Sequence, residues 1–514
     1  MLARIQGEVE RHKPLFVPIP WHDMAGMGHD DHRRCHTVTD RSIWRGIRPP
    51  LFAARLPKRW REAVVRFAPI ALLLAASLAA PPAGQARASA ENGSWTSYHR
   101  SASNNAAFTE PGQAAMSWRS VTMKDEILAV SVVSDTVYAA GAGQTHAVYA
   151  LSRRSGQPIW GRLVDNVVMT QPIVAGGRVF VGTGNNYMRD DPVRDYNSVS
   201  RGTDANSIYA LDQGTGTVLW KLALQGEAMP TPIYSAGTLY WATGDRRFLA
   251  VDAASGRIVW ALRLPSYVSM SSPVRDGNLI MFGGAHPFAE YAVDIVSRRI
   301  AWRHAFTQFG GRAVTGAIDD CSPAVSDHTL FCTGTTSATT MPNGGDTVGQ
   351  FAWALDTRTG QALWQSGLGD GKPPDFFAAG VPTVLNGVVY VESPGNKGLW
   401  ALDARTGHAR WHATLAAMGR SAPVVDGAAL FTTDDAGTLY QFDARTGSLA
   451  HRMRLGGGVS NLGIVLASGS LYVPNSRGGV VDAIPERLIT AAPGIDVAPP
   501  NGPVATTQNG VSCG

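Results

Sequence analysis

The stretch Ile208-Tyr209-Ala210-Leu211-Asp212, followed by Thr215-Gly216 and Trp220, decides the fold because its pattern returns along most of the chain. In each copy the Asp position leads to the Gly position by four residues and to the Trp position by eight. Self-similarity of this kind is the signature of a repeat fold. The seven copies are Ser152/Gly156/Trp160, Asp212/Gly216/Trp220, Asp252/Gly256/Trp260, Asp294/Arg298/Trp302, Asp356/Gly360/Trp364, Asp403/Gly407/Trp411 and Asp443/Gly447/His451.

A short hairpin precedes each copy. Two hydrophobic runs flank a two-residue turn such as Asp276-Gly277, a dipeptide that favours the turns matching strand twist. Each repeat therefore predicts four strands, and the spacing of successive tryptophans, from 40 to 62 residues, suits one propeller blade per repeat. The eight turns are Ser134-Asp135, Gly176-Gly177, Ala236-Gly237, Asp276-Gly277, Ser326-Asp327, Asn386-Gly387, Asp426-Gly427 and Ser468-Gly469.

The last blade lacks a fourth strand, and the start of the repeat region has one strand to spare. The hairpin near Leu471 has no Trp after it, and Trp118 has no blade before it, so we expect the strand at Trp118 to finish the last blade. The predicted fold is an all-β, eight-bladed β-propeller of four-stranded antiparallel blades over residues 91–484, closed by an N-terminal strand. Flat rings at the Trp positions can bury a face against the next blade, which makes them structural. These residues are Trp118, Trp160, Trp220, Trp260, Trp302, Trp364 and Trp411.

The repeats resemble the pyrroloquinoline-quinone (PQQ) type of propeller repeat. That family includes the quinoprotein alcohol dehydrogenases and the outer-membrane assembly propeller BamB. The resemblance covers about residues 95–484 and is specific for the fold, but a propeller is a scaffold for unrelated activities. It implies a non-enzymatic binding or assembly module, which we favour, or alternatively a PQQ-dependent dehydrogenase acting on an alcohol or polymer.

The dehydrogenase alternative depends on residues near Asn185. The run Gly182-Thr183-Gly184-Asn185 looks like the family's blade in which an Asn helps bind calcium beside the quinone. The family's adjacent Cys-Cys pair, its calcium-binding Glu and a fused haem motif have no counterpart in the sequence. PQQ and calcium are expected only under this alternative, with Asn185, Asp320 and Asp375 as the candidate cofactor-binding residues, and no other metal site is predicted.

Four long segments are predicted on one rim of the ring. Residues 185–206 and 333–350 lie between the second and third strands of a blade, and residues 303–322 and 365–381 link blades, so all four emerge on the same face. Such loops carry binding sites. We expect a partner or ligand on this face, where aromatic rings could also stack on a carbohydrate or polymer. The predicted binding-face residues are Arg189, Asp191, Arg312, Phe376 and Phe377.

Cys321 and Cys332 flank the turn at Ser326-Asp327, and this spacing predicts that they face each other across the hairpin. An exported protein can oxidise such a pair to a disulfide, with two buried thiols as the alternative.

Residues 59–90 have the order of a secretory signal: basic residues, an apolar run over 67–80 and small residues at a cleavage site. The run is shorter than the ~20 residues that span a bilayer. No Cys lies at the junction, so a lipoprotein anchor is not supported. We therefore expect a periplasmic protein without a transmembrane span, an upstream segment 1–58 that is not part of the mature protein, and a disordered Pro/Gly-rich tail over 485–514.

The net charge of +5 comes from the first part of the chain. Residues 1–66 carry 13 Lys/Arg and 7 Asp/Glu, which leaves 32 and 33 for the rest. A propeller without basic excess makes nucleic acid an unsuitable partner. The expected partner is an envelope protein or a small-molecule or polymer ligand, bound by a monomer.

Overall fold

A computed structural model of the chain describes residues 95–101, 107–108, 115–188, 199–340, 345–373, 379–458 and 462–486. The upstream segment 1–58, the export signal 59–90 and the tail beyond residue 486 lie outside the described residues. Within the described ranges, no helix is both long and apolar enough to cross a membrane.

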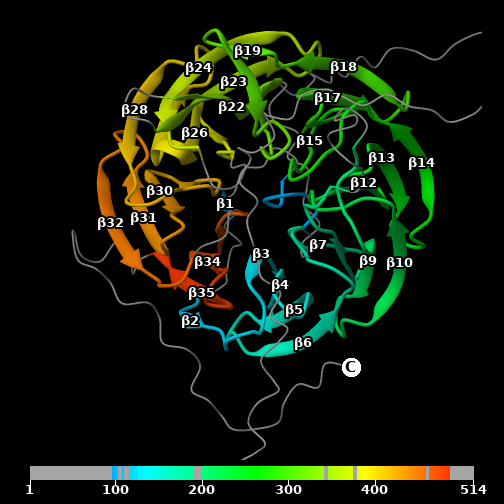
Figure 1. Ribbon diagram of the computed structural model, residues 1–514. Coiled ribbons are helices and arrows are strands. Elements are labelled where there is room, and N and C mark those ends of the chain that lie inside the picture. Colours follow the sequence, from blue (N-terminus) through cyan, green and yellow to red (C-terminus); the bar gives the residue numbers. More distant parts are fainter. Residues whose placement is uncertain are drawn as a thin grey trace, which may run out of the picture. The chain divides into compact units, whose positions relative to one another are not determined.

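The predicted architecture is confirmed: the described strands form eight antiparallel blades in a ring, with short innermost strands and long outer ones (Figure 1). Blades 1 to 4 consist of β3 (Ile127–Val133), β4 (Thr136–Gly141), β5 (Ala147–Ser152) and β6 (Pro158–Leu163); β7 (Ile173–Ala175), β8 (Arg178–Gly182), β9 (Asn206–Asp212) and β10 (Val218–Leu224); β11 (Ile233–Ser235), β12 (Thr238–Thr243), β13 (Arg247–Asp252) and β14 (Ile258–Arg263); β15 (Val274–Asp276), β16 (Leu279–Gly284), β17 (Ala289–Asp294) and β18 (Arg299–Ala305).

The second half of the ring repeats this order. Blades 5 to 8 consist of β21 (Ala324–Ser326), β22 (Thr329–Thr340), β23 (Asp346–Asp356) and β24 (Ala362–Gly371); β25 (Thr383–Leu385), β26 (Val388–Ser393), β27 (Gly398–Asp403) and β28 (Ala409–Thr414), with the 3-10 turn η1 (Pro394–Asn396); β29 (Val424–Asp426), β30 (Ala429–Thr433), β31 (Thr438–Asp443) and β32 (Leu449–Arg454); β33 (Val465–Ala467), β34 (Ser470–Asn475), β35 (Val480–Pro485) and β2 (Trp118–Arg119).

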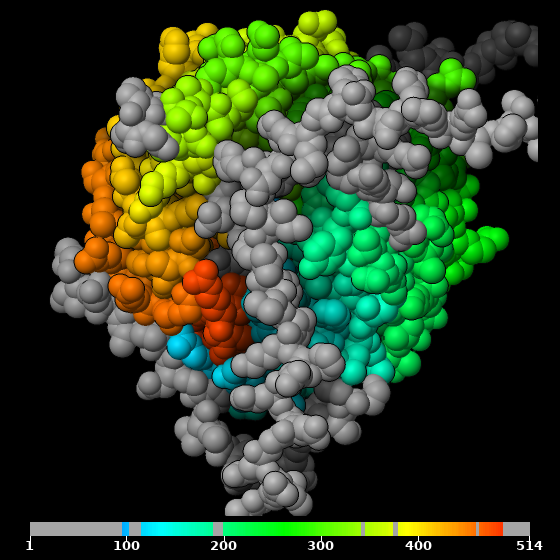
Figure 2. Space-filling view, viewed as in Figure 1, coloured from blue at the N-terminus to red at the C-terminus, as the bar shows by residue number. Residues whose placement is uncertain are grey.

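The N-terminal strand β2 closes the ring, as predicted. It pairs antiparallel with β35, with Trp118 opposite Ala483, and the Arg119 guanidinium lies 2.6 Å from the Asp482 carboxylate. The N-terminal strand and the last strands of the chain therefore share one sheet, blade 8, and Figure 2 shows the red C-terminal part of the chain directly against the blue-to-cyan N-terminal part. This arrangement leaves the ring without a free seam.

The motif tryptophans fasten each blade to the next. The indole N–H of Trp364 donates to the Ala404 carbonyl at 2.9 Å, one residue after the Asp position of the following blade. The face of the same ring covers Gly407, where an added Cβ would lie 2.6 Å from Trp364. The same indole bond recurs from Trp118 to Arg153, Trp160 to Gln213, Trp220 to Ala253, Trp302 to Thr357 and Trp411 to Ala444.

Gly407→Ala is expected to lower the free energy of unfolding by about 1–3 kcal/mol, because the new Cβ meets the Trp364 ring and φ is +73°. Gly277→Ala is the matched control, since it has φ +59° but no atom within 4 Å of an added Cβ. Urea unfolding of both variants separates the docking effect from backbone strain. Equal losses in the two variants would contradict the docking role of the glycine.

Blade 5 differs from the expectation in two ways. Residues 333–350, predicted as a loop, mainly extend β22 and β23, and the link before them adds β19 (Gln308–Phe309) and β20 (Arg312–Gly316) to the sheet. The hairpin turns at Asp327-His328 and not at Ser326-Asp327, because Ser326 pairs with Thr329. The turns predicted at Asp276-Gly277 and Asp426-Gly427 also lie one residue later, since Asp276 pairs with Leu279 and Asp426 pairs with Ala429. In these hairpins the last residue of the innermost strand stays paired, which the sequence of the turn does not reveal.

Cys321 and Cys332 form a disulfide with Cα atoms 6.1 Å apart. Cys321 precedes β21, so the two residues are not cross-strand partners as the predicted register required. The bridge instead ties the link between blades 4 and 5 to β22. This link carries Asp319 and Asp320.

Candidate functional site

Six of the links between blades carry one recurring position shortly before the innermost strand of the next blade. It stands three residues before the proline that leads into an innermost strand, such as Pro323 before β21. Because blades repeat around the ring, these residues recur at one depth. They are Met169, Met229, Met270, Asp320, Ala379 and Arg420, and all are buried or partly exposed. We call these six described residues the axial ring, and their side chains are apolar except for one carboxyl group and one guanidinium group.

Arg201 joins this ring from the end of the blade 2 insertion. Its Nε lies 3.2 Å from Glu227 Oε1 and its Nη1 lies 3.9 Å from Asp319 Oδ2. The guanidinium carbon also lies 5.7 Å from the centre of the Tyr267 ring. Four segments that are far apart in sequence thus meet at one buried arginine.

Glu227 is wholly buried beside Arg201, and two glycines make this possible. A Cβ at Gly184 would lie 2.5 Å from Glu227 Cβ, and one at Gly244 would lie 2.6 Å from Glu227 Cγ. Gly184 belongs to the run that resembles the family's calcium-binding blade. In this chain the glycine makes room for a carboxyl group.

The carboxyl groups of the cluster favour their neutral forms. Burial raises the pKa of Asp320 well above its usual value, and the neighbouring Asp319 raises it further, whereas Arg201 and Arg420 oppose the shift. Burial also raises the pKa of Glu227 to about 7 against the opposing charge of Arg201. Asp320 therefore favours its neutral form and lies within the electrostatic influence of two guanidinium groups.

Arg420 is the second cation of the site. Burial lowers its pKa, while Asp435 and Asp320 act in the opposite direction. No described carboxylate lies within 4.0 Å of its guanidinium group, so Arg420 has no ion-pair partner among the described residues. A partly buried, unpaired guanidinium group is suited to bind an anion.

Glu392 is wholly buried next to the link that carries Arg420, and its carboxyl group accepts a hydrogen bond from the Thr432 hydroxyl. Burial raises its pKa to about 8. An acid whose folded-state pKa exceeds its unfolded value stabilises the fold most at low pH, and this contribution is lost as pH rises from about 4.5 to about 8. Stability should therefore decline over this range.

Glu392→Gln is expected to reduce the loss of unfolding free energy between pH 4.5 and 8 by more than about 1 kcal/mol, because the amide cannot ionise. Chemical denaturation across this pH range measures the effect. Asp212→Asn is the control, since Asp212 is only partly buried at the end of β9 and hydrogen bonds from Thr215 lower its pKa. An unchanged pH profile in Glu392→Gln would show that Glu392 does not set the dependence.

The predicted site residues fall into three groups. Asp320 lies in the central cluster. Arg312 does not: it donates to Asp370 at 3.1 Å and to the carbonyls of Ser337 and Thr347, so it crosslinks the blade 5 extension. The remaining residues, Arg189, Asp191, Asp375, Phe376 and Phe377, lie outside the described residues.

Asn185 has a structural role in its loop. Its side-chain oxygen accepts bonds from Thr203 N, Thr203 Oγ1 and Tyr187 N at 3.0 to 3.2 Å. Three donors already use this oxygen, and calcium needs six to eight such ligands. Among the described residues no group of three His, Cys, Asp or Glu could hold a metal ion. The arrangement at Asn185 does not fit the calcium and quinone expected under the dehydrogenase alternative.

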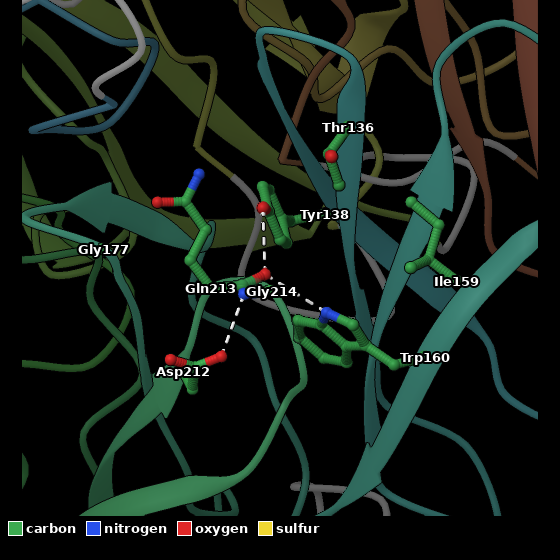
Figure 3. A pocket seen from close by; sticks show the side chains of 8 residues that line it. All are labelled: Thr136, Tyr138, Ile159, Trp160, Gly177, Asp212, Gln213 and Gly214. Atoms are coloured by element: carbon green, nitrogen blue, oxygen red, sulfur yellow. Dashed lines mark hydrogen bonds between the residues drawn. The ribbon is translucent and has the colours of Figure 1, made fainter.

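A hollow of about 470 Å³ lies between blades 1 and 2, away from the central cluster (Figure 3). The Gln213 carbonyl in its wall accepts bonds from the Tyr138 hydroxyl at 3.3 Å and the Trp160 indole at 3.2 Å. These polar groups serve blade docking, so the central cluster remains the candidate site.

Eight blades fastened by motif tryptophans define the class of PQQ-like β-propellers. Residues 106–198, 192–339 and 350–486 match the family described as "Outer membrane protein assembly factor BamB". The chain belongs to this family.

Three individual proteins illustrate the range of relatives. The chain is 29% identical over 377 residues to tetrathionate hydrolase of Acidithiobacillus ferrooxidans, covering 71% of this chain and 73% of the relative. It is 25% identical over 288 residues to BamB of Yersinia pestis, covering 55% and 67%. The structure of quinohemoprotein alcohol dehydrogenase from Comamonas testosteroni superposes with a TM-score of 0.53 at 13% identity, covering 77% and 81%, which shows a shared fold alone.

The sequence pattern did not predict that Glu227, Arg201 and Arg420 belong to one site. Aligning the links on their prolines would have found Asp320 and Arg420 as the two charged residues at an otherwise apolar position. Arg201 and Glu227 carry no such signal, because only the folded ring brings them together.

Proposed function

We propose that this protein hydrolyses tetrathionate or a closely related linear polythionate at Asp320 and Arg420. The observation that carries the proposal is the placement of Asp320, a carboxyl group whose pKa is raised by burial, near the guanidinium groups of Arg201 and Arg420 in an otherwise apolar axial ring. The relative named tetrathionate hydrolase supports the substrate class, since its similarity extends over 71% of this chain. A polythionate suits such a ring because it has charged sulfonate ends and an apolar sulfur centre.

The cluster provides the groups that this reaction needs. Water adds to a terminal sulfonate sulfur, the adjacent S–S bond breaks, and the sulfonate leaves as hydrogen sulfate. The sulfane sulfur that departs takes a proton. Protonated Asp320 can donate this proton, and Arg420 can bind and orient a sulfonate through its planar donors. Arg201 lies beside Glu227 and Asp319, and its charge opposes the rise that burial causes in the pKa of both carboxyl groups.

Incubation of the purified protein with tetrathionate tests the proposal. We expect tetrathionate to disappear and one sulfate to form for each molecule consumed, without added quinone or electron acceptor. Stable tetrathionate between pH 2 and 8 would overturn it.

The second candidate is an exported, periplasmic binding or assembly module that contacts an envelope protein through its loop-rich face. The match to the BamB family over most of the ring favours it. Co-purification from an envelope extract, compared between the intact protein and one with residues 188–203 replaced by a Gly-Ser link, tests this candidate. Equal recovery of a partner by both proteins would remove the loop-rich face from consideration.

A further inference from the structure

We infer that residues 95–101 close the axial channel and that Tyr98 and His99 form the floor of the central site. The identity of the bound anion rests on the proposed function, whereas the closure of the channel does not. Residues Trp95, Ser97, Tyr98 and His99 are each at most 1% exposed, although they belong to no blade. Figure 1 shows this blue N-terminal segment inside the ring, next to β7.

The segment enters the channel from the rim of short turns. Trp95 exchanges two backbone hydrogen bonds with Val174 of β7, at 2.7 and 2.8 Å. Tyr234 of β11 donates to the Thr96 carbonyl at 2.8 Å. Val174 and Tyr234 each lie close to the turn that follows their strand, at Gly176-Gly177 and Ala236-Gly237. Because the segment runs antiparallel to β7, it proceeds toward the face that carries the links.

At the link end, the segment crosses from blade 2 to blade 8. The backbone N–H of His99 donates to Gln171 Oε1 at 2.8 Å, and the Gln171 amide donates to Val130 of blade 1 at 2.7 Å. The Tyr98 hydroxyl donates to the Leu462 carbonyl at 3.0 Å, just before β33. The Tyr98 and His99 rings stack with centroids 4.1 Å apart. These contacts connect three blades across the axis.

The chain then turns back. His99 and Arg100 have positive φ of 50° and 69°, which fits a tight reversal. Further on, β1 (Ala107–Phe108) pairs in parallel with β33, with Ala107 opposite Leu466, and so runs toward the rim of short turns. One limb of the N-terminal region thus lies on blade 2 and the other on blade 8.

The floor lies next to the link that carries Arg420. Gln171 and Ala422 follow the axial residues Met169 and Arg420 by two positions, a step of about 7 Å in extended chain. A Cβ at Gly463 would lie 3.0 Å from the His99 ring and 3.6 Å from the Ala422 nitrogen. His99 is therefore packed at the level below Arg420.

A closed floor makes the site a pocket with a single mouth. The substrate enters and the products leave through the link face. The depth between the charged ring and the floor then limits how long an anion can be when one of its ends is bound at Arg420. Tyr98 and His99 act in this scheme as specificity-determining residues and not as catalytic ones.

Chain-length preference tests the inference. In the intact protein we expect tetrathionate to be cleaved with a kcat/KM at least about tenfold above that of hexathionate, and Tyr98→Ala to reduce this ratio at least threefold by deepening the pocket. Trp95→Ala is the matched control, because it removes an equally buried ring at the far end of the segment. A ratio that both variants leave unchanged, or shift equally, would overturn the role of Tyr98.

A thiol-protection measurement tests the closure even if no polythionate is cleaved. Ser97→Cys, in full-length protein carrying Cys35→Ser and Cys513→Ser, should react with a maleimide at least 100-fold more slowly when folded than in urea. Ser297→Cys, at an exposed turn, is the control and should react at similar rates in both states. Rapid labelling of folded Ser97→Cys would show that the channel is open.

Discussion

Asp320→Asn is expected to lower kcat for tetrathionate by about 10²–10⁴-fold while leaving thermal stability nearly unchanged. The amide keeps the size of the side chain but cannot release a proton. Burial and the neighbouring Asp319 raise the pKa of Asp320 and so favour its protonated form, which is the form that the proposed reaction uses. Steady-state kinetics of the purified variant, with sulfate release as the signal, measures the loss.

Asp370→Asn is the control for this substitution. Asp370 binds Arg312 on the same face of the ring but belongs to the blade 5 extension. We expect it to retain at least half of the wild-type kcat. A comparable loss in both variants, or full activity in Asp320→Asn, would remove Asp320 from the reaction.

Trp118→Ala is expected to lower the free energy of unfolding by about 3–5 kcal/mol, the cost of removing a large buried ring. Trp118 is 4% exposed, donates its indole N–H to Arg153 at 2.7 Å and belongs to the strand that closes the ring. Its loss should weaken both blade 8 and the junction with blade 1. Calorimetric unfolding of the variant measures this effect.

His451→Trp provides the comparison, because His451 occupies the one Trp position of the repeat that holds another residue. We expect a change of less than about 1 kcal/mol, since no closing strand depends on this side chain. If Trp118→Ala were as mild as His451→Trp, closure of the ring would not depend on the N-terminal strand.

The repeats allowed the ring to be predicted because each copy places the same side chains in the same local geometry. The spacing of Asp, Gly and Trp fixes a turn and a docking contact, and the unpaired Trp118 completes the count of strands. Blade 5 was harder to predict, since Thr329–Thr340 alternates small polar residues that fit a long strand as well as a loop.

The site could be predicted only in part. Asp320 was selected from a long link between blades, but Glu227 and Arg420 come from links that are far apart in sequence and come together only in the closed ring. The channel floor at Tyr98 and His99 has no signal of its own, because its segment occurs once and the contacts that bury it are with Gln171 and Leu462. Repeat patterns reveal the scaffold and leave such single contacts undetermined.

A crystal structure of Asp320→Asn soaked with tetrathionate tests the central claim most directly. The account predicts one dianion in the axial ring, with a sulfonate at Arg420, sulfur atoms beside residue 320 and no density beyond Tyr98 and His99. Tetrathionate bound instead in the hollow between blades 1 and 2, or on the outer strands with the axial ring occupied by water alone, would contradict it.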